Sequence, residues 1–113
     1  MSCLFKALSN FTADNSDELR SKICDFLEQN PILFADIRVN DIIKWEKDSN
    51  YIMNMRDSET WGGAIEIKSF CEIYKIQVNV HIIMNNRIVN FIPLDGPISI
   101  INITWNGNHF TSN

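Results

Sequence analysis

The chain has 113 residues, of which 45% are hydrophobic and 21% are charged. This length and composition suit one domain with a hydrophobic core and exclude a disordered chain. The formal net charge of −4 disfavours non-specific binding to nucleic-acid phosphates. No apolar run approaches the roughly 20 residues that a membrane span needs. We expect one domain over residues 1–113, a monomer with neither a nucleic-acid nor a membrane partner.

The cysteine pattern bears on metal binding and on the cellular compartment. The chain has an odd number of cysteines, Cys3, Cys24 and Cys71, which are widely spaced, and no CxxC pair is present. This pattern predicts neither a disulfide framework nor a zinc site. We expect no metal and no cofactor, and a reducing, cytoplasmic environment.

The first two predicted elements are helices. A helix-prone apolar run starts at Cys3, and Asn15 or Ser16 can cap a second helix that ends before Pro31. Apolar residues recur at helical spacing along this second helix, which predicts that Arg20 and its other charged residues face solvent. The apolar positions are Leu19, Ile23, Phe26 and Leu27, and the outward ones are Arg20, Lys22, Asp25 and Glu28.

The middle of the chain is predicted to continue as helices. Residues 32–38 are irregular or form a short helical turn, and Asn40 or Asp41 can cap the next helix. Another short helix is expected around residues 51–55. A longer one is expected over Ala64–Tyr74, where apolar residues return at helical spacing.

The C-terminal part is predicted to form strands. Apolar residues alternate over 76–82, and β-branched residues are frequent in 87–92 and 98–105, the last of which we expect to be central in a sheet. Turn residues lie at 85–86 and 106–107, and a last short strand follows the second turn. The predicted class is α+β, with N-terminal helices packed on a small, mostly antiparallel C-terminal sheet.

Two residues at opposite ends of the chain suggest nucleophilic chemistry. A cysteine at a helix N-terminus loses its proton more easily, and hydrolysis by a thiol needs an imidazole within reach. His81 lies inside a predicted strand, whereas His109 follows a turn, where catalytic groups are common. Cys3 and His109 are therefore the candidate pair. The alternative is that Cys3 is a small buried residue near a frayed terminus.

Four blocks of sequence resemble one family. Residues 2–8 (SCLFKAL) resemble the nucleophile motif of the ovarian-tumour (OTU) cysteine proteases, and residues 61–67 (WGGAIEI) resemble their Trp-Gly-Gly segment. Residues 76–80 resemble the strand that follows in the family, and residues 108–110 (NHF) its terminal His-aromatic motif. The blocks occur in the family's order and cover nearly the whole chain.

The resemblance implies a papain-like cysteine isopeptidase. Such an enzyme removes ubiquitin, or a ubiquitin-like modifier, from lysine side chains. Cys3 would be the nucleophile, His109 the general base, and backbone N–H groups, including that of Cys3, the oxyanion hole. The family is also common in viruses, and a viral member would act on ubiquitin or polyubiquitin in the host cytoplasm.

The resemblance also implies a narrow groove for the Gly-Gly end of ubiquitin. The loop at Trp61, Gly62 and Gly63 would border this groove, and Asp57 and Glu59 would attract the arginines of the ubiquitin tail. From the residues alone, Trp61 is more simply a core anchor at a helix entrance, and the two acids belong to a solvated loop. The residues expected at the substrate are Asp57, Glu59, Trp61, Gly62, Gly63 and Asn108.

The chain departs from the family at two places. The family normally has an Asp-Gly pair just upstream of the nucleophile motif, but only two residues precede Cys3 here, so either the chain is trimmed or the oxyanion hole is built without that aspartate. The family also often has Asp or Asn two residues after the histidine, where this chain has Thr111; Asn113 or Asn108 could orient the imidazole instead. These departures leave two alternatives open: a catalytically impaired ubiquitin-binding module, and an interaction domain unrelated to ubiquitin.

Overall fold

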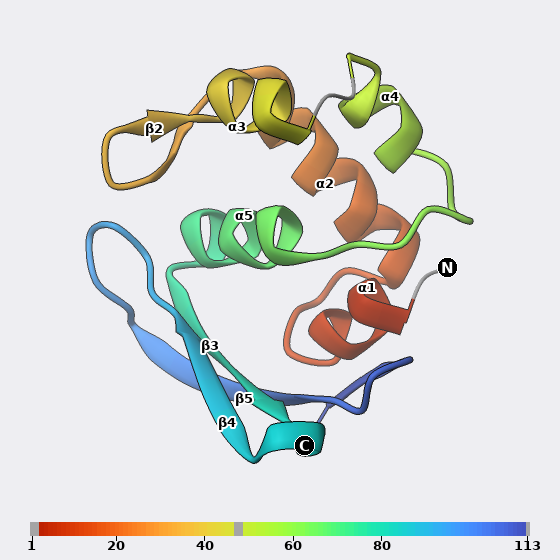
Figure 1. The fold of residues 1–113 in the computed structure, drawn as a ribbon, viewed down its shortest axis with the longest axis vertical. Coiled ribbons are helices and arrows are strands. Elements are labelled where there is room, and N and C mark those ends of the chain that lie inside the picture. Colours follow the sequence, from red (N-terminus) through yellow and green to blue (C-terminus); the bar gives the residue numbers. More distant parts are fainter. Residues whose placement is uncertain (1–2, 47–48, 113) are drawn as a thin grey trace.

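The computed structural model describes residues 3–46 and 49–112, and its helices lie against one face of a sheet (Figure 1). The α+β class predicted from the sequence is confirmed. The helices are α1 (Cys3–Ser9), α2 (Ser16–Glu28), α3 (Val39–Glu46), α4 (Tyr51–Met55) and α5 (Ala64–Tyr74), with a 3-10 turn η1 (Ile83–Asn85). The strands are β1 (Ile32–Phe34), β2 (Ile37–Arg38), β3 (Ile76–Ile82), β4 (Arg87–Phe91), β5 (Ser99–Trp105) and β6 (Phe110–Ser112).

The main sheet has the strand order β4-β3-β5-β6. Strands β3 and β4 are antiparallel, as are β5 and β6, whereas β3 and β5 run parallel with Val78 opposite Ile101. The sheet is therefore mixed, with antiparallel pairing on both sides of a parallel centre. This order places the last strand at an edge, next to α1 (Figure 1).

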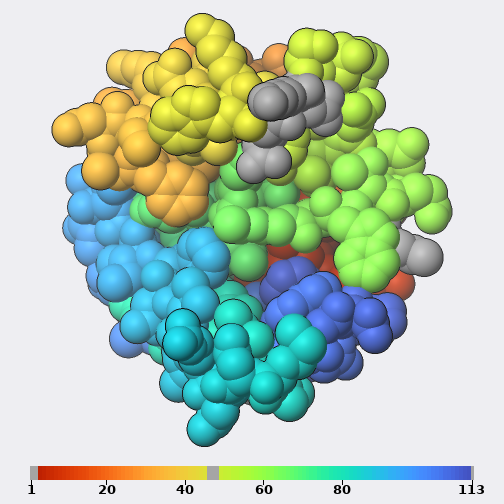
Figure 2. Space-filling model, in the orientation of Figure 1, coloured from red at the N-terminus to blue at the C-terminus, as the bar shows by residue number. Residues whose placement is uncertain are grey.

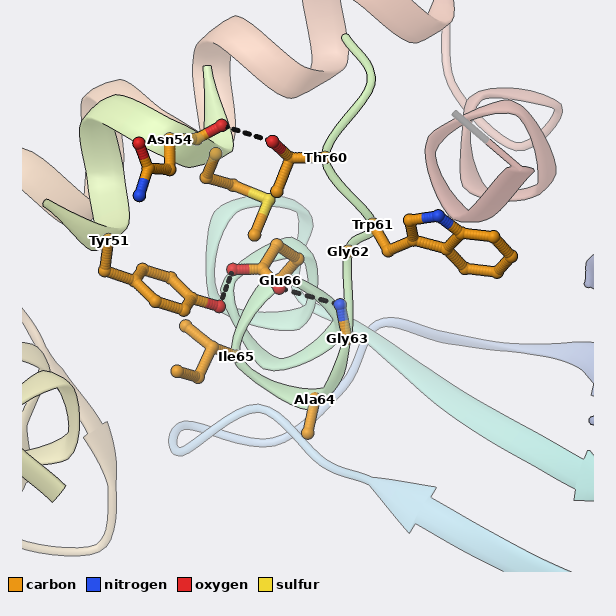
Figure 3. A pocket seen from close by; sticks show the side chains of 10 residues that line it. Tyr51, Asn54, Thr60, Trp61, Gly62, Gly63, Ala64, Ile65 and Glu66 are labelled. Carbon is orange, nitrogen blue, oxygen red and sulfur yellow. Dashed lines mark hydrogen bonds between the residues drawn. The ribbon is translucent and has the colours of Figure 1, made fainter. Parts of the chain in front are cut away.

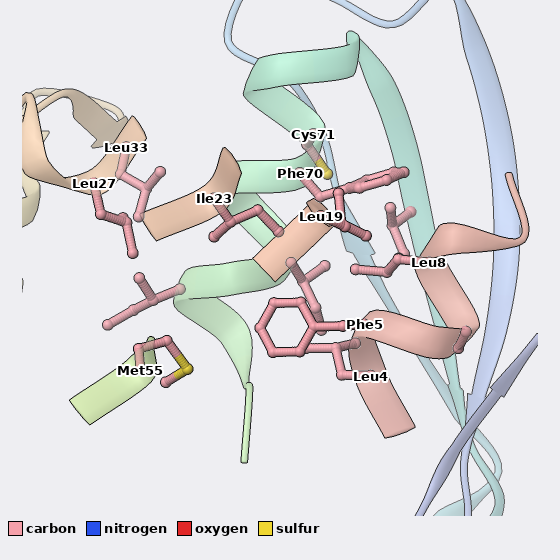
Figure 4. Packing of buried hydrophobic residues seen from close by; sticks show 14 of the residues in the cluster. Leu4, Phe5, Leu8, Leu19, Ile23, Leu27, Leu33, Met55, Phe70 and Cys71 are labelled. Atoms are coloured by element: carbon pink, nitrogen blue, oxygen red, sulfur yellow. The ribbon is translucent and has the colours of Figure 1, made fainter. Parts of the chain in front are cut away.

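The core lies between the helices and the inner face of the sheet. Apolar residues of α1, α2 and α5 pack together (Figure 4), and the sheet contributes Val78, Val80 and Ile103. Helix α1 has only 7 residues, too few to be stable alone, so its packing stabilises it. The core residues labelled in Figure 4 are Leu4, Phe5, Leu8, Leu19, Ile23, Leu27, Leu33, Met55, Phe70 and Cys71.

Helix α2 begins as the sequence predicts. The side chain of Asn15 accepts a hydrogen bond from the backbone of Glu18, and Glu18 accepts one from the backbone of Asn15. This reciprocal capping box satisfies two N–H groups that a helix start leaves unpaired. None of the helices among the described residues is long and apolar enough to span a membrane.

The prediction that Arg20 faces solvent is wrong. Its residue is only 3% exposed, and its guanidinium lies between α2 and the segment after α4. Arg20 shares the spacing i, i+3, i+4, i+7 with Ile23, Cys24 and Leu27, which are all buried. The apolar stripe of α2 thus extends to Arg20, whose charge is satisfied by hydrogen bonds inside the fold.

The segment 32–38 and the start of α3 also differ from the predictions. Residues 32–38 form the hairpin β1–β2, which turns where Ala35 has a φ of 48°. Helix α3 begins at Val39, and the side-chain oxygen of Asn30 accepts the N–H of Asn40 at 2.9 Å. Two N–H groups at this helix start are thus bonded by residues that precede the hairpin, Asn30 for Asn40 and Pro31 for Val39, which sequence spacing does not reveal.

Candidate active site

The candidate nucleophile Cys3 is the first residue of α1 and is half-buried. Cys24 and Cys71 are completely buried. Burial raises the pKa of the Cys24 thiol to about 11 and that of the Cys71 thiol to about 12. Since the thiolate is the reactive form, these two cysteines are structural, and Cys3 is the one of the three whose side chain is not fully buried.

The candidate base His109 lies in the β5–β6 hairpin loop, which Asn106 shapes. The side-chain oxygen of Asn106 accepts the N–H of Asn108 at 2.9 Å and the N–H of His109 at 2.8 Å. The backbone N–H of Asn106 donates in return to the carbonyl of His109. Gly107 has a φ of +99°, which favours glycine. The loop thus presents an exposed His109 from a fixed backbone.

Helix α1 and strand β6 form the two sides of one open depression of about 490 Å³. Cys3 and Lys6 line it from α1, and Phe110 and Thr111 line it from β6, directly after His109. The side chain of Asn10 donates to the Ser112 hydroxyl at 2.8 Å and ties the end of α1 to β6. The fold therefore places Cys3 in the same depression as Phe110, the residue that directly follows His109.

Residues 57–63, here called the groove loop, complete this site. The indole of Trp61 stacks on the imidazole of His109 with ring centroids 6.2 Å apart. The next residue, Gly62, lies so close to α1 that an added Cβ would be 2.8 Å from Leu4 Cδ2. The groove loop thus contacts both the helix that begins with Cys3 and the imidazole. In Figure 2 the red α1 shows only between the green segment and the dark-blue C-terminal end.

The interpretation of Trp61 as a core anchor is wrong. Its side chain is 47% exposed and its ring points away from the buried cluster around Glu66 (Figure 3). The helix entrance is instead fixed by Glu66, which is fully buried in α5. Glu66 accepts the N–H of Gly63 and the hydroxyl of Tyr51, each at 2.7 Å. Burial raises the pKa of this carboxyl despite these two hydrogen bonds.

The two acids of the groove loop are exposed. The Asp57 carboxylate accepts the backbone N–H of Glu59 at 2.9 Å, and so it also shapes the loop. Both side chains lie on the surface beside Trp61, accessible to a cationic segment. Asn108 is likewise exposed, in the loop next to His109.

None of the candidates for orienting the imidazole bonds to it among the described residues. Thr111 lies opposite Thr104 in the β5–β6 register and lines the depression with Cys3. Within residues 3–46 and 49–112, no hydrogen bond joins its hydroxyl to the ring of His109. Asn113 and the two residues before Cys3 lie outside the described residues. In the described part of the chain, no cluster of His, Cys, Asp or Glu could hold a metal ion.

Comparison with known proteins places this fold and site in a family. The sequence model described as OTU-like cysteine protease matches residues 2–107. The chain belongs to the OTU-like cysteine protease family. The predicted family is thereby confirmed, and three of the four sequence blocks, residues 2–8, 61–67 and 76–80, lie within the match. The match ends before His109 and Thr111, so the roles of these two residues rest on geometry and on the local motif.

Solved OTU domains share the fold of this OTU-like chain. An ovarian-tumour domain in complex with ubiquitin is 31% identical, with a TM-score of 0.79 over 98% of this chain. This chain spans 62% of the length of that domain's chain. No curated protein matches the sequence.

Two more distant structures show the same fold. The viral OTU protease of Dera Ghazi Khan virus is 17% identical, with a TM-score of 0.65; the match covers 96% of this chain and 71% of that one. An OTU deubiquitinase of Wolbachia pipientis wMel, bound to ubiquitin, is 20% identical, with a TM-score of 0.62; the match covers 98% of this chain and 88% of that one.

Sequence reasoning about this OTU-like chain missed three residues that shape the site: Arg20, Glu66 and Asn106. Two of them had a local signature. Glu66 stands three residues after the helix N-cap Gly63, where a carboxylate commonly accepts the cap N–H. Asn106 opens an Asn-Gly turn, in which the Asn side chain often accepts N–H groups of following residues. The contacts of Arg20 join segments far apart in the sequence.

Proposed function

We propose that this chain is a cysteine isopeptidase that removes ubiquitin, or a ubiquitin-like modifier, from conjugates. The observation that carries the proposal is the meeting of α1 and β6 at one depression, with Cys3 on one wall and Phe110, the residue after His109, on the other. Membership of the OTU-like cysteine protease family supports this activity. The complexes of two related OTU domains with ubiquitin support the choice of substrate.

In the proposed reaction, the imidazole of His109 takes the proton of the Cys3 thiol. The thiolate then attacks the C-terminal glycine carbonyl of the modifier. The amide N–H of Cys3, the first residue of α1, has no partner within the helix and donates to the oxyanion that forms. The imidazolium protonates the departing lysine amine as the C–N bond breaks. Water, deprotonated by the imidazole, then hydrolyses the thioester and restores the thiol.

The groove loop provides the route by which the modifier's tail reaches the thiol. The close approach of Gly62 to Leu4 and Phe5 packs this loop directly on α1. In the proposal the modifier's tail runs along the outer side of the loop to Cys3, in a passage narrow enough to accept a Gly-Gly terminus and to exclude tails with larger side chains. Asp57 and Glu59 lie exposed in the same loop, where they would attract the arginines of the ubiquitin tail.

In this proposal, Trp61 and Thr111 together orient the imidazole of His109. The stacked indole restricts the plane of the ring. The Thr111 hydroxyl, on the wall of the depression, accepts from the ring N–H when the substrate is bound. Asn108 and Asn113 are the alternatives for this second role. A threonine lacks the charge that stabilises imidazolium, which is the observation that favours the alternative of a ubiquitin-binding module.

A ubiquitin probe with a cysteine-reactive C-terminus tests the proposal. We expect covalent capture by the wild type and none by Cys3→Ala, with the adduct mapped to Cys3. His109→Ala should abolish turnover of diubiquitin while circular dichroism shows an intact fold. His81→Ala is the matched control, because His81 lies in β3 and bonds to Asn102. Capture of Cys3→Ala would refute the assignment, and reversible binding without capture would establish the binding module.

A further inference from the structure

Arg20 makes an unusual set of contacts for a charged residue in a helix. Its guanidinium donates to the backbone carbonyl of Met55 at 2.7 Å, to that of Thr60 at 2.9 Å and to that of Ser58 at 3.3 Å. These carbonyls belong to the end of α4 and to the groove loop. A single side chain of α2 thus bonds the backbone on both sides of the turn that leads to Trp61.

Arg20 also contacts α1. The central carbon of its guanidinium lies 4.1 Å from the centroid of the Phe5 ring, a cation–π geometry in a buried site. Phe5 in turn contacts Gly62, since an added Cβ there would lie 3.0 Å from its Cε2 atom. Arg20 therefore lies between the helix that begins with Cys3 and the loop that holds Trp61.

We propose that Arg20 is a positioning residue of the substrate groove, holding the groove loop on α1 so that Trp61 stays stacked on His109. This inference rests on the proposed isopeptidase function. Arg20 acts through the groove loop, because its guanidinium bonds backbone carbonyls just before that loop and within it and lies on the Phe5 ring of α1.

The contacts require arginine in particular. The guanidinium is a planar fork with several N–H donors, so it can bond separate carbonyls while one face lies on an aromatic ring. Lysine has a compact ammonium on a flexible stem and cannot reproduce this arrangement. The helix α1 is also held by Ala7 and Leu8, which are buried in the core. Loss of the fork should therefore loosen the groove loop and the stacking of Trp61 on His109, while α1 keeps Cys3 in place.

The test compares Arg20→Lys with Arg56→Lys on ubiquitin bearing a C-terminal fluorogenic amide. Arg56 is the matched control, because it lies beside the same loop but pairs on the surface with Asp25 and Glu28. For Arg20→Lys we expect KM to rise about tenfold with kcat within about threefold of wild type, the signature of lost substrate binding. Arg56→Lys should change neither. A role in stability alone would lower kcat with the folded fraction and leave KM unchanged, which would overturn the inference.

A second readout does not depend on catalysis. Acrylamide quenching of Trp61 is obtained by subtracting the signal of a matched Trp61→Phe protein. We expect Trp61 to be more accessible to acrylamide in Arg20→Lys than in wild type, and unchanged in Arg56→Lys. Arg20→Gln, which buries no charge, gives the same comparison if the lysine variant does not fold. If wild type fails to cleave the substrate, the proposed function fails, and quenching alone decides on Arg20: equal accessibility in all proteins would refute its positioning role.

Discussion

Trp61 is the residue at which stability and function separate most clearly. One side of its indole is open to solvent, and the ring lies on the imidazole of His109. A half-exposed aromatic residue stabilises a fold far less than a buried one, since less of its area leaves water on folding. Its contact with His109 instead places it where it affects the reactive imidazole and the path of the substrate.

The substitution Trp61→Ala should therefore lower catalysis much more than stability. We expect the free energy of unfolding to fall by less than about 1 kcal/mol, against the 3–5 kcal/mol typical of a deleted buried aromatic ring. We expect kcat/KM for a fluorogenic ubiquitin substrate to fall at least ~tenfold, and Trp61→Phe to restore most of it. Urea unfolding and steady-state kinetics on the same samples measure both. A loss of unfolding free energy of several kcal/mol would contradict this prediction and would indicate that Trp61 packs as a core residue.

At the scale of single residues, the sequence predicted the local positions of Cys3 and His109 better than the residues that support them. Cys3 stands at a helix start and His109 after a turn, and both positions depend on local patterns. Arg20 was misplaced because charged residues are rarely buried, and its compensating carbonyls lie 35 to 40 residues away. Helical periodicity alone could have placed Arg20 on the buried stripe of α2, but it could not have identified the carbonyls that bond to its guanidinium.

Among the elements, the entrance to α5 contains two adjacent glycines with different surroundings. At Gly62 an added Cβ would lie 2.8 Å from Leu4 and 3.0 Å from Phe5, both of which are buried and have little freedom to move. At Gly63 an added Cβ would meet nothing within 4 Å. One glycine is thus required by close packing between elements, whereas the other is the N-cap of α5.

The pair Gly62→Ala and Gly63→Ala tests this difference. We expect Gly62→Ala to cost about 1–3 kcal/mol of unfolding free energy, the usual effect of overpacking, and to lower the rate of capture by the ubiquitin probe. Gly63→Ala should cost less than about 1 kcal/mol, the size of a weakened N-cap. Chemical unfolding and probe kinetics measure these effects. Equal costs at the two positions would contradict the close approach of the groove loop to α1.

Elements with strong periodicity were predicted well from the sequence, and those defined by contacts across the chain were not. The bounds of α5 and β3 follow from helical spacing and alternation. The hairpin β1–β2 is short, and its turn at Ala35 lacks the usual glycine. At the start of helix α3, the N–H of Asn40 donates to the side chain of Asn30, which precedes that hairpin in the sequence. Such partners become neighbours only after folding.

At the scale of the whole molecule, the topology explains how the two chain ends meet. The antiparallel pairs β3–β4 and β5–β6 follow from local turns, but the parallel pairing of β3 with β5 joins strands about 20 residues apart. That pairing places β6 at the sheet edge beside α1. The predicted α+β class is therefore confirmed, whereas the sequence did not predict the strand order, which depends on this pairing of distant strands.

Two buried thiols and the partly buried hydroxyl of Tyr74 keep their protons at high pH. Burial raises the pKa of Cys24 to about 11 and that of Cys71 to about 12. Burial, together with the nearby Asp14 carboxylate, also raises the pKa of Tyr74 above its ordinary range. In the unfolded chain, thiols lose their protons near pH ~8.5 and tyrosine near ~10. Each group therefore binds more protons in the folded state than in the unfolded state at alkaline pH.

Stability should consequently fall as the pH rises above about 8.5, because the contribution of each raised pKa is complete below the unfolded value and is lost towards the folded one. Each group adds a slope of up to about 1.4 kcal/mol per pH unit within its window. We expect Cys24→Ala to be less stable than wild type at pH 7, yet to show a shallower decline between pH ~8.5 and ~11. Ile23→Val is the matched control, since it shortens a neighbouring buried side chain without removing a titrating group, and its curve should run parallel to wild type. Urea unfolding at each pH gives the slopes. Equal slopes for Cys24→Ala and wild type would mean that the Cys24 thiol ionises as easily inside the fold as in the unfolded chain.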